Sequence, residues 1–186
     1  MLIRPSTQKD LAVVDALLMR TYPKLLKADY PSSILVKALP IISRAQPKLL
    51  SCGTYYVVEE DGVTRGAGGW TQDEDQLDLG HIRHVVTDDR ALRRGVGRRL
   101  MQHCFQMART VEVLKMECWA TRTAVPFYKA VGFTEVGPID VALVDGMGSV
   151  FRQCGCYATS RTGVTQRSAC RRTTFLIGKR LERFKF

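Results

Sequence analysis

The sequence predicts an α/β fold built on a mixed β-sheet, and three observations support this prediction. Segments 10–19 and 97–110 place apolar residues at helical spacing. Segment 54–60 is rich in β-branched and aromatic residues, and the hairpin dipeptide Asp61-Gly62 follows it directly. An apolar strand-like segment, 77–87, then leads through a short glycine-containing turn into the second helical segment. Such a mixture of strands and helices indicates one α/β sheet whose fourth and fifth strands are central.

The predicted elements follow the order β-α-α-β-β-β-α-β-α-β. The dipeptides Tyr22-Pro23 and Tyr30-Pro31 mark turns around the first two helices. Glycines weaken the third strand and indicate close packing or a bulge, and Pro138 limits the sixth strand to an edge or a bulged position. The elements are a strand at 2–3, which a cap at Ser6 or Thr7 follows, helices at 10–19 and 32–45 (the second interrupted at Pro40), strands at 54–60, 63–71 and 77–87, a helix at 97–110, a strand at 114–119, a helix at 123–131 that Gly132 ends, and a strand at 133–143.

Length and composition favour one globular domain. The chain has 186 residues, of which 45% are hydrophobic and 25% charged. No apolar stretch approaches the ~20 residues that cross a membrane, and the first residues lack a signal-peptide pattern, so we expect no membrane association and a cytoplasmic location. The six cysteines have no zinc-site spacing and are expected to be reduced thiols, and no metal site is expected.

The basic charge is concentrated at the C-terminal end. Residues 1–144 contain 19 Lys and Arg against 16 Asp and Glu, whereas residues 145–186 contain 9 against 2. The predicted division is therefore a domain at 1–144 and a basic, poorly patterned tail at 145–186. The tail is interpreted either as a genuine basic extension or as an out-of-frame or diverged end that replaces a final strand. Its charge is scattered, so a nucleic-acid partner is not expected.

The turn after the fourth strand has the properties of an anion site. The apolar run ends at Val86, and Gly95 and Gly97 open the next helix. Helix-start N–H groups lack helical partners and lie at the positive end of the helix dipole. Glycine allows the backbone to approach an anion closely. Charged donors are available from Arg93, Arg94, Arg98 and Arg99.

A later segment, Thr121–Phe133, contains Pro126-Phe127-Tyr128 and Gly132-Phe133. With this segment and the turn, the chain resembles the GCN5-related N-acetyltransferase (GNAT) superfamily over residues 1–144. The resemblance implies the acyl-CoA N-acyltransferase type of sheet. It implies that acetyl-coenzyme A is the co-substrate, with its pyrophosphate on Arg93, Arg94, Gly95, Val96, Gly97 and Arg98. It also implies that a backbone N–H near Val85 or Val86 polarises the thioester carbonyl, and that Tyr128 protonates the leaving thiolate. Thr121 stands where many relatives have a coenzyme-contacting asparagine, and it serves either in that contact or as a helix cap.

Two features depart from the family pattern or leave alternatives open. Leu92 occupies a position where the family has Gln or Arg, and the turn is one residue longer than usual. The general base is not identified by the sequence. His81 and His84 are candidates, and strict alternation would place them on opposite faces of the fourth strand. The other candidates are Glu117, Asp78 and a water chain, and Cys118 offers a less usual acyl-cysteine route.

The sequence thus predicts an acetyl-coenzyme A-dependent N-acetyltransferase that transfers the acetyl group directly to a primary amine. The acceptor, a small molecule or a peptide, is not identified by any motif. Two other functions are compatible with the sequence: a non-catalytic acyl-coenzyme A-binding module, and a basic nucleic-acid-associated protein that acts through its tail. A homodimer is also compatible.

Overall fold

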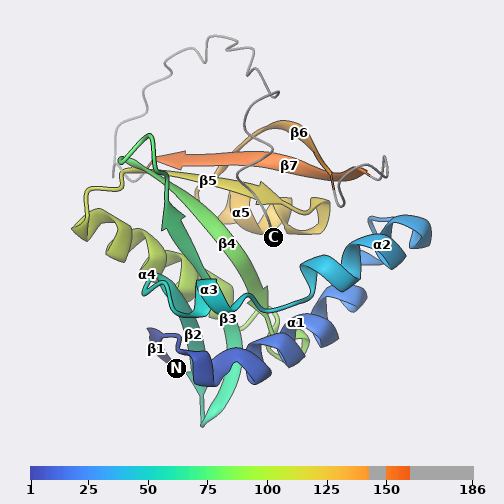
Figure 1. Ribbon diagram of the computed structural model, residues 1–186, viewed down its shortest axis with the longest axis horizontal. Helices are drawn as coiled ribbons and strands as arrows, with labels where there is room; N and C mark the ends of the chain where they lie inside the picture. The colour runs from blue at the N-terminus through green and yellow to red at the C-terminus, as the bar shows by residue number, and fades with distance from the viewer. Residues whose placement is uncertain (143–149, 160–186) are drawn as a thin grey trace.

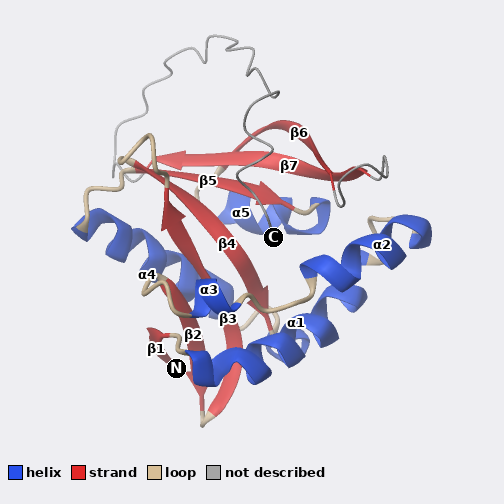
Figure 2. Ribbon diagram, viewed as in Figure 1, coloured by secondary structure: helices blue, strands red, loops and turns tan. Residues whose placement is uncertain are grey.

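The computed structural model describes residues 1–142 and 150–159, which form one seven-stranded sheet with helices on both faces (Figures 1 and 2). The strand order is β1-β2-β3-β4-β5-β7-β6, in which only β4 and β5 are parallel neighbours. The strands are β1 (Leu2–Pro5), β2 (Tyr55–Glu60), β3 (Val63–Gln72), β4 (Leu79–Thr87), β5 (Lys115–Ala120), β6 (Thr134–Ala142) and β7 (Val150–Thr159). The helices are α1 (Leu11–Leu26), α2 (Ser32–Ile42), α3 (Pro47–Leu50), α4 (Val96–Thr110) and α5 (Val125–Ala130), with 3-10 turns η1 (Gln8–Asp10), η2 (Asp89–Ala91) and η3 (Arg122–Ala124).

The predicted fold class is confirmed, and the ten predicted elements appear in the predicted order. The structure adds the short helix α3 and the strand β7. It also extends α1 through Pro23, where a turn was expected. Proline removes one helical hydrogen bond, but the extra turn of helix buries Leu26 against Tyr30, and this packing outweighs the local preference.

Strand β7 lies beyond the domain end that the sequence predicts. It pairs with β5 on one side, where Cys156 faces Cys118, and with β6 on the other. The sheet therefore continues past residue 144 to Thr159, and the other residues of the predicted tail lie outside the described part of the chain. Since β7 separates β6 from β5, β6 is an edge strand, as Pro138 predicts.

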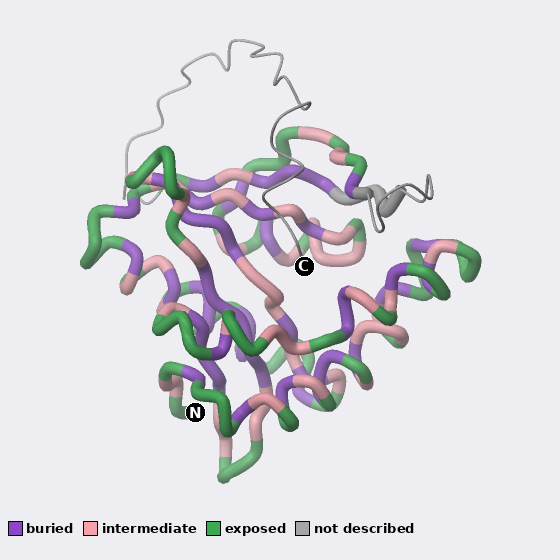
Figure 3. Tube along the Cα trace, viewed as in Figure 1, coloured by how far each residue is buried: buried purple, intermediate pink, exposed green. Residues whose placement is uncertain are grey.

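The sheet separates two apolar cores, visible as buried strand segments in Figure 3. One face packs on α4 and α5 through Leu100, Met101 and Tyr128. The other face packs on α1 and α3 through Leu18 and Leu50. Helix α2 continues this second layer away from the sheet, where it packs against the end of α1. Among the described residues, no helix is both long and apolar enough to cross a membrane.

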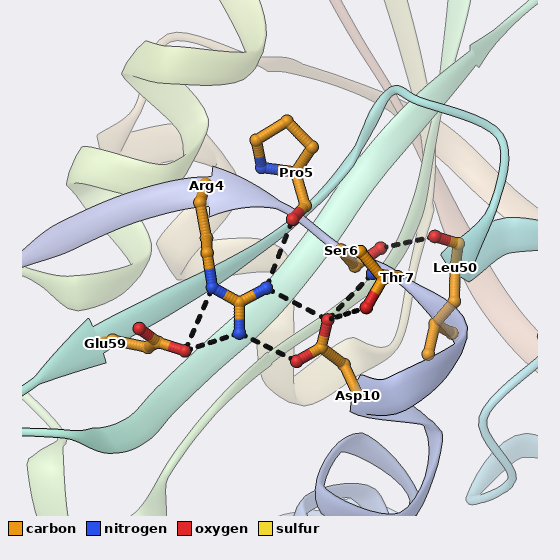
Figure 4. A network of polar contacts seen from close by, with 7 residues as sticks. All are labelled: Arg4, Pro5, Ser6, Thr7, Asp10, Leu50 and Glu59. Carbon is orange, nitrogen blue, oxygen red and sulfur yellow. Dashed lines mark hydrogen bonds and ion pairs between the residues drawn. The ribbon is translucent and has the colours of Figure 1, made fainter.

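An ion-pair network fixes the N-terminal strand to the start of α1 (Figure 4). The Arg4 guanidinium lies 2.8 Å from an Asp10 carboxylate oxygen and 2.6 Å from Glu59 on β2. Asp10 also accepts the backbone N–H of Thr7 at 2.7 Å, so Thr7 is the residue at the helical cap. The hydrogen bonds from Arg4 lower the pKa of Asp10 to about 2, against an opposing effect of burial.

We expect Asp10→Asn to destabilise the protein by about 2 kcal/mol at pH 7, because the variant loses the charged partner of Arg4. The pKa of Asp10 is lower in the folded state than in the unfolded state. Its contribution is therefore present above about pH 4 and is lost as the pH falls from about 4 toward 2. Urea unfolding at stepped pH measures this, and the exposed Asp61→Asn is the control. Parallel stability–pH curves for Asp10→Asn and the unmodified protein would contradict the assignment.

Candidate active site

Strands β4 and β5 are paired at one end only. Their parallel register covers three pairs, from Leu79–Lys115 to His81–Glu117. Beyond these residues β4 keeps its partner β3, whereas β5 pairs with β7. The two strands therefore diverge (Figure 1), and a cavity of about 730 Å³ lies where they part. The start of α4, helix α5 and parts of α1 and α2 complete the cavity wall.

The backbone of β4 presents N–H groups to this gap. The Asp88 N–H donates to a carbonyl of β3 at 2.8 Å, and Val86 is paired with β3 two residues earlier. Because N–H groups alternate in direction along a strand, those of Val85 and Thr87 point away from β3 and into the gap. The Tyr22 hydroxyl approaches the Val85 carbonyl from α1 at 3.5 Å, which agrees with this direction. Val85 and Val86 are the two positions predicted to polarise the carbonyl. The Val85 N–H points into the cavity, whereas Val86 is paired with β3 and its side chain packs in the α1 core.

A bulge in β4 changes the expected placement of the two histidines. His84 has a backbone φ of +42°, and the register with β3 shifts at this point. A bulge breaks the alternation of side chains along a strand, so strict alternation does not apply between His81 and His84. Both histidines line the cavity, whose walls come from both faces of the sheet. The Tyr55 hydroxyl donates to the His84 carbonyl at 2.9 Å and supports the bulged backbone.

The His84 imidazole is held in its neutral form. Burial, together with the nearby positive charge of Arg83, lowers its pKa to about 4. Its Nδ1 atom is buried without a hydrogen-bond partner among the described residues. A neutral imidazole with so low a pKa is a weak general base near pH 7.

His81 belongs to a chain of polar side chains at the point where the strands part. Its Nε2 lies 2.8 Å from an Asp73 carboxylate oxygen, and its Nδ1 lies 3.9 Å from Glu117. Although burial opposes ionisation, hydrogen bonds from His81 and two backbone N–H groups lower the pKa of Asp73 to about 2. The Trp119 indole donates to Glu117 at 2.7 Å. Within the described residues, no group of three His, Cys, Asp or Glu side chains is arranged to hold a metal ion.

The start of α4 has the geometry of an anion site. Gly95 caps the helix with φ +83°, a left-handed conformation that favours glycine. The Arg99 N–H donates to the Gly95 carbonyl at 3.0 Å. The preceding N–H groups, of Val96, Gly97 and Arg98, are therefore the ones that a helix start leaves without helical partners. All three residues line the cavity, so a phosphate there would meet these N–H groups and the positive end of the dipole.

The four predicted arginines do not all belong to this site. Arg93 and Arg98 line the cavity. Arg94 instead forms an ion pair with Glu60 on β2 at 2.8 Å, and neither Arg94 nor Arg99 is part of the wall. The cavity wall also includes the exposed Leu92, which supplies no charged donor.

Gly97 is constrained by packing as well as by its position at the helix start. A Cβ atom there would lie 3.0 Å from the Phe127 ring and 3.2 Å from the Thr87 hydroxyl. Glycine therefore allows α4 to approach α5 closely. A bulky residue at Gly97 would disturb this helix contact and an anion site together, so it cannot separate the two effects.

Asp88 anchors the turn before α4 and was not predicted from the sequence. Only 3% of this residue is exposed. Its carboxylate lies 2.7 Å from Arg20 on α1 and 3.3 Å from Arg65 on β3, and it accepts the Arg90 N–H at 3.0 Å. An Asp at the start of a helical turn is a cap signal that was visible in the sequence. The distant arginines that hold it could not be recognised from local patterns.

Tyr128 lies in the cavity wall beside a cysteine. Burial raises the pKa of Tyr128 well above its usual value, and the neighbouring Cys118 side chain raises it further. Burial also raises the pKa of Cys118 to about 12. Cys118 therefore remains a thiol near neutral pH and is a poor nucleophile, which argues against an acyl-cysteine route. Tyr128 keeps its proton and is a hydrogen-bond donor.

Thr121 begins the η3 turn, but its side chain makes no capping hydrogen bond. It lines the cavity, which favours the predicted contact over the predicted cap. Next to it, the Arg122 N–H donates to the Tyr30 hydroxyl at 2.8 Å. This bond joins the connection between α1 and α2 to the end of β5.

Comparisons with known proteins agree with this geometry. The family profile described as "Acetyltransferase (GNAT) domain" matches residues 43–142. A GCN5-related N-acetyltransferase structure from Rhodopseudomonas palustris is 18% identical with a TM-score of 0.69, over 85% of this chain and 94% of that chain. The PaiA N-acetyltransferase of Thermoplasma acidophilum, solved in complex with coenzyme A, is 11% identical with a TM-score of 0.65, over 85% and 98%. A ribosomal-protein-alanine N-acetyltransferase of Brucella melitensis is 17% identical with a TM-score of 0.58, over 86% and 99%.

At these identities the three likenesses concern the fold. None of the curated proteins matches the chain.

Proposed function

The chain belongs to the GNAT acetyltransferase family, and from this premise we propose that it transfers the acetyl group of acetyl-coenzyme A directly to a primary amine. The observation that carries the proposal is the cavity at the parting of β4 and β5, which joins the anion site of α4 to the chain of polar side chains around His81. Relatives of the same fold have been solved with coenzyme A.

The residues of the cavity fit the chemical groups of the coenzyme. The N–H groups of residues 96–98 and the guanidinium groups of Arg93 and Arg98 would hold its pyrophosphate. The Val85 N–H, directed into the gap, would donate to the thioester carbonyl and to the oxyanion that forms from it. A donor of this kind is worth about 3 kcal/mol in the transition state. The polar side of Thr121 would contact the same ligand.

Of the two candidate histidines, we assign the general base to His81. Asp73 accepts the Nε2 proton of His81, which leaves Nδ1 to receive a proton from the acceptor ammonium. His84 stays neutral to about pH 4, and this weak basicity favours a role in positioning. Glu117, 3.9 Å from Nδ1, would stabilise the imidazolium that forms.

We assign the general acid to Tyr128. Its buried hydroxyl retains its proton and lies in the cavity wall beside a sulfur atom, the Cys118 thiol. A leaving thiolate is a stronger acceptor than that thiol and would receive the Tyr128 proton as negative charge develops on sulfur, against the opposing effect of the raised pKa of Tyr128. The cytoplasmic location and the homodimer remain predictions that the described residues do not test.

We expect Tyr128→Phe to lower turnover by about 10²- to 10⁴-fold, the usual contribution of a general acid, with little change in coenzyme affinity. Thiol release from acetyl-coenzyme A in the presence of amines measures turnover, and calorimetry measures binding. Tyr157→Phe, on β7 and outside the cavity wall, is the matched control. A loss below threefold would leave Tyr128 with a structural role. Coenzyme binding with no thiol release under any amine would support the acyl-coenzyme A-binding module.

We expect His81→Gln to remove the acid limb of the pH–rate profile, because the variant lacks the imidazole that must be neutral to accept the proton. The rate at neutral pH should fall by about 10²-fold or more while coenzyme affinity is kept. His103→Gln, on α4 and outside the cavity wall, is the control. A profile of unchanged shape in His81→Gln would assign the base to another group.

A further inference from the structure

The cavity has a second half, on the face of the sheet that α1 and α2 cover. On β5, Met116, Cys118 and Ala120 pack toward α4 and α5. The alternate residues Glu117 and Trp119 therefore point to the opposite face. The same alternation on β4 directs His81 and Arg83 there, because Ile82 between them packs with α4. All four of these polar or aromatic residues line the cavity.

The charges in this helix-covered half leave a net negative charge. Arg83 is largely buried, and the nearest opposite charges that act on it are those of Glu117 and Asp73. Arg83 also donates to the Thr71 hydroxyl at 2.9 Å. Around His81, the carboxylates of Glu117 and Asp73 and the guanidinium of Arg83 sum to −1; Glu117 and Arg83 line the cavity, and Asp73 lies behind His81, 2.8 Å from its Nε2. The other charged residues of the described cavity wall, Arg93 and Arg98, belong to the α4 end.

One ammonium group on the acceptor would balance this charge. When the ammonium passes its proton to His81, the amine becomes neutral and His81 becomes an imidazolium next to Asp73 and Glu117. The net charge of these groups together with the amine is zero before and after this transfer. A carboxylate beside the amine would instead add an uncompensated negative charge to a buried site, which is costly. The positive charge of Arg83 already interacts electrostatically with Glu117 and Asp73.

The opposite wall of this half is apolar. Helix α1 contributes Tyr22 and Leu26, and α2 contributes Ile42. Leu26 and Ile42 are each less than a tenth exposed and pack together in the cluster between α1 and α2. Trp119 faces them from β5, with its indole N–H already bound to Glu117. A hydrocarbon or aromatic group would pack between these residues, whereas a second ammonium or several hydroxyls would be buried without partners.

We propose that the acceptor is a primary monoamine that has an apolar or aromatic arm and no carboxylate next to the amine, an inference that rests on the proposed acetyl transfer. Phenethylamine represents this class. Phenylalanine differs from it by one carboxylate, and spermidine replaces the apolar arm with further ammonium groups.

The test compares these three amines with the full chain. With acetyl-coenzyme A, we expect kcat/KM for phenethylamine to exceed that for phenylalanine and for spermidine by at least about tenfold. Binding is measured separately by calorimetry in the presence of coenzyme A, and phenethylamine should again bind most tightly. If thiol release is not observed but this order of binding is, the proposed reaction fails and the acceptor class stands. An equal or reversed order of binding overturns the inference whether or not the enzyme turns over.

Glu117→Gln tests the charge argument directly. It removes one negative charge but keeps an oxygen to accept the Trp119 N–H. We expect KM for phenethylamine to rise by about tenfold and the discrimination against phenylalanine to shrink by a similar factor. Glu112→Gln, exposed beyond the end of α4, is the control. An unchanged phenethylamine-to-phenylalanine ratio in Glu117→Gln would overturn the charge argument.

Discussion

The site depends on a backbone constraint, namely that β4 and β5 stop pairing after His81 and Glu117. Each strand is paired on its other side, β4 with β3 and β5 with β7. The N–H groups of Val85 and Thr87 consequently face a cavity. This opening supplies oriented donors at no further cost in reorganisation.

Ion pairs connect the turn before α4 to helix α1, which covers the opposite face of the sheet. Asp88 fixes the turn from within, and it does so through Arg20 of α1. Asp89 extends the contact to Lys24 on the same helix. The helix that carries Tyr22 and Leu26 into one half of the cavity is thus attached to the loop that forms the anion site in the other half. A rearrangement of α1 would therefore shift residues at both ends of the site.

Local patterns in the sequence were sufficient for most of the fold. Periods of 2 and 3.6 residues located the main elements, and the strand–glycine–helix order located the turn for which we propose an anion site. The features that were not predicted depend on contacts distant in sequence. Strand β7 lacks a clear alternating pattern and is held by its partners β5 and β6. The bulge at His84 depends on β3, and Arg94 pairs with Glu60 instead of lining the cavity. The cap position of Asp88 has a local sequence signal. Its burial between two arginines has none, because both arginines are distant in sequence.

The central claim is that the open edge of β4 and the start of α4 bind one ligand together. Amide hydrogen exchange, measured with and without acetyl-coenzyme A, tests this most directly because it reports each N–H. The account predicts added protection at Val85 and at residues 96–98. The Val86 N–H, already paired with β3, should change little. Protection confined to the helix start, or appearing away from both segments, would contradict the account.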